Sequence, residues 1–413
     1  MLNGGKTVKS ARTVTPDQFR PDDPEIQKDP YPYYTVLRDQ APVLKSKFGD
    51  QPCWILSRRE DIGRVLMDPA TFSSRTTAVP NMLFSDPPEH GRLRKMVAHM
   101  FTRTAVQPVA PQIKHHAESL IEAQLATGRC DIINDFAGPL TVALIGLVLG
   151  IPVFEVERLR ELTRLQMEYV GAIRLGREPS REARLASEGL IQFVTELVRA
   201  ENYDNGRVVS VLADLVRHGE LTGEECAQYV VMLLIAGHST TTNLIGNAVY
   251  VLSQRPGDLD RMKDDEAFTT SFVEEVLRTR PSFHRNIRIT TRDVDVSGQT
   301  IPAGSVVRLL LASANRDAAY FDDPESFDPD EKRRTHFAFG QGIHTCLGAW
   351  LARLEASTAL RVFSRRVASV AIDPEKPLVC VSGGTFNEFG FEHLPVLLSP
   401  RVLKREDAEA VAF

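Results

Sequence analysis

The residues with the clearest potential for chemistry surround Cys346. The run FGQGIHTCLG, residues 339–348, leads into a predicted helix over residues 347–367. Cys346 therefore stands at a helix N-terminus, where free N–H groups and the positive end of the helix dipole favour a thiolate. Gly340, Gly342 and Gly348 remove side chains where a flat macrocycle would approach the backbone. This pattern favours a metal-binding thiolate over a merely buried cysteine in a glycine-rich turn.

The loop resembles the haem-binding signature of the cytochrome P-450 family, FGxGxHxCxG, and Ala352-Arg353 follows it. The resemblance implies haem b with Cys346 as the axial thiolate ligand of the iron, and haem contacts from Gly340 and Gly348. It also implies that Phe339 shields the sulfur and that His344 bonds a haem propionate. A thiolate ligand donates electron density to haem iron and favours O–O cleavage.

Two more segments resemble family positions that hold the propionates. Residues 86–94 read DPPEHGRLR, which places His90 and Arg94 four residues apart on one helical face. Arg288 begins a strand-like run over residues 288–290. Buried propionates need cationic or donor groups. A solvated helix surface would explain His90 or Arg94 alone, but three separate matching segments favour propionate binding.

Glu275 and Arg278 form a Glu-x-x-Arg pair, and residues three apart on a helix are neighbours that often form a salt bridge. Upstream of the cysteine loop, the pair resembles the ExxR motif of the family. The resemblance implies a structural role in the haem-binding core, with a further partner from a downstream loop. Arg333, Arg334 and His336 are the candidates for that partner.

The middle of a predicted helix over residues 221–254 reads AGHSTTT, from Ala236 to Thr242. Gly and β-branched residues are poor helix formers, and hydroxyls here can bond back to helix carbonyls. The conflict indicates either a functional site or close helix packing. The stretch resembles the oxygen-activation motif of the family, (Ala/Gly)-Gly-x-(Asp/Glu)-Thr-(Thr/Ser). Thr240 matches the motif threonine, and Ser239 stands at the acid position.

Ser239 departs from the motif in a way that bears on catalysis, because a carboxylate can shuttle a proton near neutral pH and a serine cannot. In the family the acid helps to deliver protons to dioxygen through the threonine and water. Three interpretations remain: a hydroxyl-only relay through Ser239, a polar group on the substrate, or less standard chemistry such as oxidative coupling, desaturation or peroxide use. His238 is a minor candidate that should point well away from Thr240.

The resemblance implies a monooxygenase that hydroxylates a small to mid-sized organic molecule, in secondary metabolism. A non-enzymatic haem binder or sensor is disfavoured because Thr240 is intact. Neither a GxGxxG pattern nor a cysteine cluster accompanies the Cys346 loop. A separate ferredoxin and ferredoxin reductase are therefore the expected partners, docking near Lys95, Arg103 and Arg353.

Four segments match family regions that contact substrate: residues 76–84, 233–240, 282–286 and 383–389. The candidate contacts in them are Leu83, Ala236, Phe283 and Phe386. His284 and Arg285 add polar groups. The mixture favours a mid-sized substrate with an apolar body and some polar groups.

The expected fold is mainly α with a smaller β-rich region, a single domain over residues 1–413, with the haem between the long helix and the cysteine loop. Periodicity predicts several elements. They are helices over 112–124, 139–148, 187–199, 221–254, 265–278 and 347–367, and strands over 42–44, 53–57 and within 287–312. Thr222 with Glu225 has capping-box spacing at the start of the long helix.

Composition is ordinary for a globular protein, with 43% hydrophobic and 25% charged residues. A net charge of −5 gives no indication of nucleic-acid binding. Five cysteines without a CxxC pair fit a reducing cytoplasm. The N-terminal residues carry no apolar run, and stretches such as 230–236 are too short to span a bilayer. We expect a cytoplasmic monomer without a membrane anchor.

Overall fold

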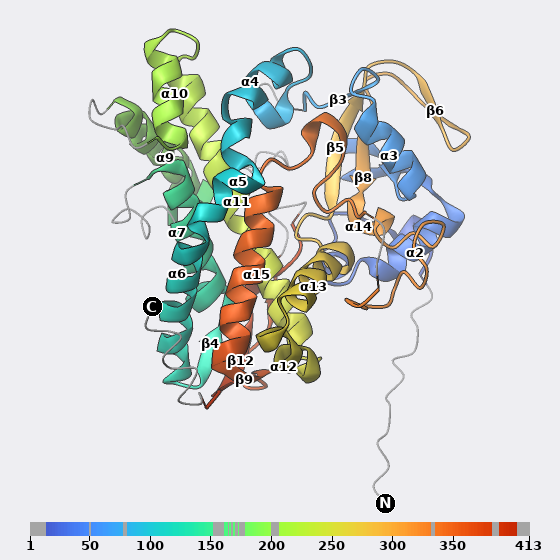
Figure 1. Cartoon of the computed structure of the whole chain (residues 1–413). Coiled ribbons are helices and arrows are strands. Elements are labelled where there is room, and N and C mark those ends of the chain that lie inside the picture. Colours follow the sequence, from blue (N-terminus) through green and yellow to red (C-terminus); the bar gives the residue numbers. More distant parts are fainter. Residues whose placement is uncertain are drawn as a thin grey trace, which may run out of the picture.

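Helices form one side of the molecule, and a β-sheet accompanied by a few helices forms the other, as Figure 1 shows. The computed structural model describes residues 14–48, 51–76, 81–151, 161–163, 165–166, 168–169, 172, 178–199, 206–331, 335–381 and 388–402. The mainly α architecture with a smaller β-rich region is confirmed.

The helices with eight or more residues are α2 (Tyr31–Gln40), α3 (Arg59–Met67), α4 (Glu89–Val97), α6 (Ala110–Leu125), α7 (Gly138–Leu149), α9 (Arg181–Arg199), α10 (Val208–Arg217), α11 (Gly223–Leu252), α12 (Pro256–Asp264), α13 (Glu266–Thr279) and α15 (Ala349–Arg366). The short ones are α1 (Pro24–Lys28), α5 (Arg103–Val106) and α14 (Leu311–Ala314).

The strands are β1 (Val43–Phe48), β2 (Gln51–Leu56), β3 (Phe72–Ser73), β4 (Arg129–Asp131), β5 (Arg285–Thr290), β6 (Val294–Val296), β7 (Gln299–Ile301), β8 (Val306–Leu310), β9 (Val367–Ile372), β10 (Val379–Cys380), β11 (Phe391–His393) and β12 (Pro395–Pro400).

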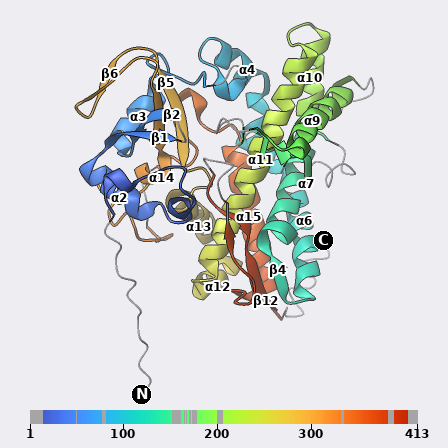
Figure 2. The same cartoon turned by 180° about the vertical axis from the view of Figure 1, so that it is seen from behind.

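The long helix α11 runs through the helical side of the molecule and packs against α7, α9, α13 and α15 (Figures 1 and 2). Its predicted capping box is present: Thr222 Oγ1 accepts from the Glu225 N–H at 3.1 Å, and Glu225 accepts from the Thr222 N–H at 2.8 Å. The helix has 30 residues, so it is roughly 45 Å long. It ends at Leu252, two residues before the predicted end.

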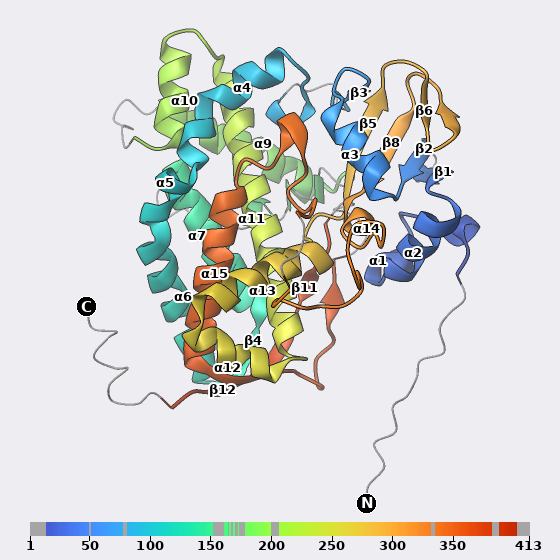
Figure 3. The ribbon, with the colours of Figure 1, turned by 45° about the vertical axis from the view of Figure 1, so that its right-hand side comes forward.

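The main sheet has five strands in the order β1-β2-β8-β5-β3. Strands β2 and β8 are parallel and the other pairs are antiparallel. The prediction of strands up to residue 312 was wrong at its end, because residues 311–314 form α14. Figures 1 and 3 show α13 between α15 and α14, so α13 joins the helical side to the sheet side.

The apolar core is continuous across α6, α7, α11, α13 and α15. One part of it contradicts the expectation that every apolar stretch is short, because Ile132–Leu149 is apolar over 18 residues. That stretch is 72% buried inside the protein, which is typical of a core helix. Its burial on α11 helps to fix the helix that carries Ser239 and Thr240.

Candidate functional site

The cysteine loop is held in shape by its own backbone. The Cys346 N–H donates to the Phe339 carbonyl at 2.8 Å, and Gly340 and Gly342 adopt φ of +67° and +75°. A Cβ on Gly342 would stand 2.4 Å from the Leu66 carbonyl oxygen of α3. Glycine at residue 342 is therefore required by the backbone conformation and by the packing on α3. This corrects the interpretation that Gly342 clears space for a macrocycle. A Cβ on Gly348 would meet no heavy atom of the described residues within 4 Å.

Cys346 lies just before α15, which begins at Ala349 with Gly348 as its N-cap. Solvent reaches the Cys346 side chain, but protein encloses it deeply, and this enclosure raises the pKa of the thiol. The Gly348 N–H and the charges of Arg94 and Arg353 act in the opposite direction and do not outweigh it. The helix N-terminus thus acts in the predicted direction on the Cys346 pKa, but burial of the thiol has the larger effect.

A cluster of charged side chains buttresses the loop from behind. Arg353 Nε and Nη2 donate to Glu274 at 2.6 and 3.0 Å, and the Arg353 guanidinium lies 4.5 Å from the Phe339 ring. Burial tends to raise the pKa of Glu274, but hydrogen bonds from His336 and Arg353 outweigh it and lower that pKa to about 2. Arg353, predicted as a docking cation, is thus already paired with a carboxylate.

Four basic residues converge beside the loop from three separate segments. His90 and Arg94 come from α4, Arg288 from β5 and His344 from the loop. The His90 and His344 rings lie 4.1 Å apart, and Arg94 Nη2 donates to the Thr345 carbonyl at 2.7 Å. The structure thus brings together the four residues that were predicted to form one group.

The basic cluster is electrostatically unfavourable without an anion. Burial lowers the pKa of His344 to about 3 and that of Arg288 to about 10, and nearby positive charges add to the effect on His344. The Nε2 atoms of His90 and His344 are buried and meet no hydrogen-bond partner within the described part of the chain. Buried donors and cations of this kind need acceptors. The cluster therefore fits a ligand with anionic arms, as the two propionates of haem are.

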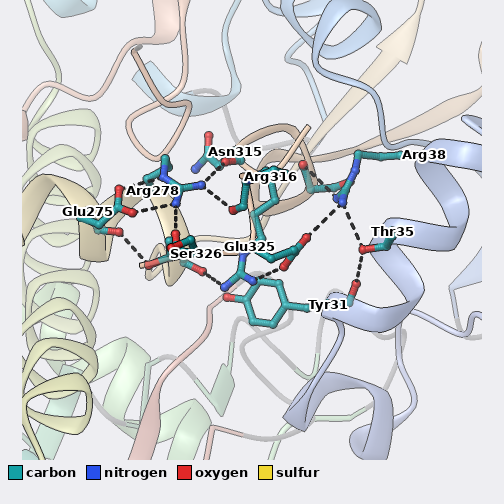
Figure 4. Close-up of polar contacts among 12 residues, drawn as sticks. Tyr31, Thr35, Arg38, Glu275, Arg278, Asn315, Arg316, Glu325 and Ser326 are labelled. Atoms are coloured by element: carbon teal, nitrogen blue, oxygen red, sulfur yellow. Dashed lines mark hydrogen bonds and ion pairs between the residues drawn. The ribbon is translucent and has the colours of Figure 1, made fainter. Parts of the chain in front are cut away.

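Glu275 and Arg278 form a buried bidentate ion pair, with Nε–Oε2 and Nη2–Oε1 distances of 2.8 and 2.7 Å. Arg278 is 1% exposed and also donates to the carbonyls of Asn315 and Ser326, as Figure 4 shows. The Asp328 N–H donates to Glu275 at 3.0 Å. The pair thus ties α13 to the loop that follows α14.

The same network reaches the sheet side of the molecule. Arg316 pairs with Glu325 and stacks on the Tyr31 ring at 3.8 Å, and Arg38 contacts Glu325 at 3.3 Å (Figure 4). One predicted partner was wrong: His336 contacts Glu274 at 3.2 Å and not Glu275. Arg333 and Arg334 lie outside the described residues.

In the middle of α11 the hydroxyls bond back to the helix, as predicted. Thr240 Oγ1 donates to the Ala236 carbonyl at 2.8 Å, and Thr242 Oγ1 donates to the His238 carbonyl at 3.0 Å. Ala236 is exposed, although Leu233 and Leu234 just before it are buried. Thr240 and Ala236 therefore share a face of α11 that is open to solvent.

Close helix packing explains another part of the same stretch. A Cβ on Gly237 would stand 2.6 Å from Ile145 Cδ1 of α7, so glycine is needed for α7 and α11 to approach. Thr141 Oγ1 lies 2.7 Å from Thr242 Oγ1 and 3.0 Å from His238 Nδ1. His238 thus faces α7, which supports the expectation that it points away from Thr240. Gly237 belongs to the packing explanation and not to the oxygen-binding groove.

A carboxylate not predicted from the sequence meets Ser239. Ser239 Oγ donates to Glu388 Oε1 at 2.7 Å, and Asn243 Nδ2 donates to Glu388 Oε2 at 3.2 Å. Glu388 lies in the 383–389 segment that was predicted to approach the substrate. A glutamate at this position does not by itself indicate a contact with Ser239. The only sign in the sequence was indirect: because residue 239 is not an acid, another segment of the chain could supply one.

The predicted substrate residues have mixed outcomes. Leu83 is 44% exposed, Ala236 is exposed, and Phe283 is half-buried and forms a β-bridge with Glu388. Phe386 lies outside the described residues.

His284 and Arg285 were wrongly expected to contact substrate. The ring nitrogens of His284 lie 3.3 Å from the hydroxyls of Tyr31 and Tyr34, and Arg285 donates to the Pro21 carbonyl at 2.7 Å. Both side chains are buried. Both therefore turn toward the N-terminal part of the chain and are held there by these contacts.

Comparison with known proteins shows which family this chain resembles. The family model described as Cytochrome P450 matches residues 178–366. The cytochrome P450 monooxygenase PikC of Streptomyces venezuelae is 35% identical, over 84% of this chain and 86% of its own length. The chain belongs to the cytochrome P450 family. It is an oxidoreductase of the monooxygenase class, and the family carries thiolate-ligated haem b.

Two further P450 proteins match almost the whole chain. The vitamin D(3) 25-hydroxylase of Pseudonocardia autotrophica is 33% identical, over 91% of this chain and 95% of its own length. The crystal structure of CYP109E1 from Bacillus megaterium in complex with testosterone superposes with a TM-score of 0.81 at 30% identity, covering 90% of this chain and 98% of that one. The P450 fold thus spans both the helical and the sheet sides of this molecule.

Proposed function

We propose that this P450 transfers one atom of dioxygen to a small or mid-sized organic molecule, chiefly by hydroxylation and in secondary metabolism. The balanced reaction is R–H + O2 + 2 e− + 2 H+ → R–OH + H2O. The observation that carries the proposal is the buried basic cluster of His90, Arg94, Arg288 and His344, which lies directly beside the Cys346 loop.

In this proposal each residue has a defined task. Cys346 is the thiolate ligand of the iron, Phe339 shields its sulfur, and Gly340 and Gly348 complete the loop around it. The bound haem supplies the redox chemistry that activates dioxygen. The four basic residues hold its propionates, and the buried Glu275–Arg278 pair keeps the surrounding loops in place. Thr240 and Ser239 handle protons on the α11 side.

Electrons come from a separate ferredoxin and ferredoxin reductase. Lys95 and Arg103 are exposed, and the Arg103 guanidinium lies 5.7 Å from the ring of Trp350, which is 48% exposed. These residues offer an acidic ferredoxin a positive surface with an apolar centre on the Cys346 side. We place the enzyme in the cytoplasm as a monomer, a single domain over residues 1–413.

The substrate meets mainly apolar side chains in this proposal: Leu83, Ala236, Phe283 and Phe386. A steroid or secosteroid is a reasonable first probe, because relatives include a vitamin D(3) hydroxylase and a testosterone-bound P450. A screen for the substrate-induced spin shift of the haem, with testosterone and vitamin D(3) in the first panel, tests this class. Spin shifts that appeared only with charged, strongly polar compounds would contradict it.

The reduced carbon monoxide complex gives the decisive test of the haem assignment. We expect the red-shifted absorption band that a thiolate ligand produces, and a histidine-type band in undamaged protein would reject Cys346 as the ligand. Oxidative coupling, desaturation or peroxide-driven oxidation is the alternative, and it rests on the missing acid at residue 239. Glu388 beside Ser239 favours the monooxygenase. Comparing ferredoxin-driven with peroxide-driven turnover separates the two.

A further inference from the structure

The contact between Ser239 and Glu388 places a carboxylate next to the motif position that lacks one. Ser239, Asn243 and Asn247 are four residues apart and so share one face of α11. Ser239 and Asn243 donate to the two oxygens of Glu388, and Asn247 Nδ2 donates to the Phe389 carbonyl at 3.2 Å. This polar stripe holds the turn 388–390 against the centre of the long helix.

The fit of the turn against the helix is close. A Cβ on Gly390 would stand 2.2 Å from Asn243 Oδ1, and the Phe389 N–H donates to the Ser282 carbonyl at 2.8 Å. The β-bridge between Glu388 and Phe283 fixes the turn from its other side. Glu388 is therefore held between α11 and the residues before β5, and its carboxylate has a defined position.

We propose that Glu388 replaces the motif acid and supplies protons to the oxygen-reducing reaction through Ser239. This inference rests on the proposed monooxygenase function. Glu388 carries the exchangeable proton but acts through Ser239, so it is a positioning residue and not one that touches the reacting atoms. The acid of the motif is thus provided in space by a segment 149 residues further along the chain.

The proton transfer balances without another reactant. Glu388 first takes up a proton from solvent and passes it to Ser239 Oγ. Ser239 in turn gives its own hydroxyl proton to a water molecule on the side of α11 that carries Thr240, and that water delivers the proton to the oxygen-reducing reaction. The Glu388 carboxylate then regains a proton from solvent, which reaches this half-buried side chain. Two such transfers supply the two protons that the proposed reaction consumes in each turnover.

A structural alternative must be separated from the relay, because the same contacts could serve only to fix the turn. Glu388→Gln is the informative variant, since the amide keeps the shape and can still accept from Ser239 but cannot release a proton. We expect its thermal midpoint to stay within about 2 °C of the wild type. We expect dioxygen uptake driven by NADH through a surrogate ferredoxin and reductase to fall about tenfold or more per haem.

Two variants complete the design. Glu392→Gln is the matched control, because Glu392 is an exposed glutamate of the neighbouring strand β11, and its uptake should equal that of the wild type. Ser239→Asp combined with Glu388→Gln returns an acid to the helix, and uptake should recover to within about threefold. Failure of this double variant to recover, or unchanged uptake per haem in Glu388→Gln, would overturn the relay.

A second measurement does not depend on turnover. The isotope-edited infrared difference between wild type and Glu388→Gln isolates the carboxyl bands of Glu388, and Ser239→Ala should shift them by removing a hydrogen bond. Unshifted bands would contradict the contact on which the relay depends. Wild-type protein that takes up no dioxygen under these conditions contradicts the proposed function instead. An active wild type with an equally active Glu388→Gln contradicts only the relay.

Discussion

The Cys346 side and the α11 side of the proposed haem site are assembled in different ways. On the Cys346 side, the proposed ligand and its neighbours Phe339, Gly340 and His344 occupy one continuous loop, which is shaped by its backbone and supported from behind by Glu274 and Arg353. On the α11 side, Ser239 meets an acid that comes from a separate turn. A loop motif can thus be recognised from a short stretch of sequence, whereas a site shared by distant segments becomes visible only in three dimensions.

The largest effect should come from the Cys346 side. Cys346→Ser removes the proposed ligand, so we expect complete loss of the red-shifted band of the reduced carbon monoxide complex. The fold should persist, because solvent reaches this side chain and its loop is held by backbone contacts. Circular dichroism checks the fold, and Cys380→Ser is the control that should keep the band. A band that survives in Cys346→Ser would end the ligand assignment.

The next largest loss is expected from the buried Glu275–Arg278 pair, which ties α13 to the loop that follows α14. Arg278→Gln removes the buried guanidinium charge that pairs with Glu275, which should cost about 3–5 kcal/mol of unfolding free energy. Chemical denaturation measures the loss. The matched control is Arg361→Gln, which breaks an exposed pair with Glu266 and should cost about 0–1 kcal/mol. Equal losses of unfolding free energy in the two variants would mean that the buried pair stabilises the protein no more than an exposed pair does.

On the α11 side, a pair of threonines separates chemistry from packing. Thr240→Ala should lower the product formed per NADH by about tenfold or more while stability stays nearly unchanged, because its hydroxyl bonds to its own helix. Thr242→Ala should do the reverse, because it removes the buried contact with Thr141. Product yield and the thermal midpoint of both variants test this. A loss of yield in Thr242→Ala alone would exchange the two assignments.

A still smaller effect concerns the packing beneath the same stretch. Gly237→Ala should destabilise the protein by about 1–3 kcal/mol, because the new methyl group overlaps Ile145. Adding Ile145→Val should restore part of the loss, since it removes the overlapping Cδ1 atom. Gly189→Ala in α9 is the control, and there a Cβ meets no heavy atom of the described residues within 4 Å. That control should be neutral or stabilising, and a destabilised control would undermine the packing argument.

The smallest effect returns to the Cys346 side and depends on pH. The pKa of Glu274 falls from an ordinary 4.5 to about 2, so the ion pair stabilises the folded state fully above pH 4.5 and loses this effect as the pH falls toward 2. The side chain is 37% exposed, so Glu274→Gln should cost only about 1 kcal/mol near neutral pH. Thermal midpoints of wild type and variant should converge as the pH falls. A difference that persists at pH 2 would contradict this assignment.

Much of the fold could be predicted because its signals are local. The Thr222 capping box placed the start of α11, and the predicted α13 and α15 were correct to within two residues at each end. Helix α9 was predicted to begin six residues too late, because its start depends on Ser180, whose hydroxyl accepts from the Ala183 N–H at 3.1 Å. The apolar pattern alone did not reveal that cap.

The parts of the site that could not be predicted depend on long-range contacts. The sequence grouped His90, Arg94, Arg288 and His344 through their resemblance to family positions, and the structure brings them together. It could not show that Gly342 packs on α3 or that His336 meets Glu274, because both contacts join segments far apart in the chain. The Glu388 contact was beyond reach for the same reason.

The 2.7 Å contact between Ser239 and Glu388 also has an evolutionary consequence. Two positions that share one proton-transfer task are under joint selection, so a change at one alters what is tolerated at the other. Among homologues we expect serine at the first position to occur together with glutamate at the second, and an acid at the first to release the second for other residues. An alignment that scores the helix motif by itself would classify such enzymes as defective, although the missing group has only moved to another part of the chain.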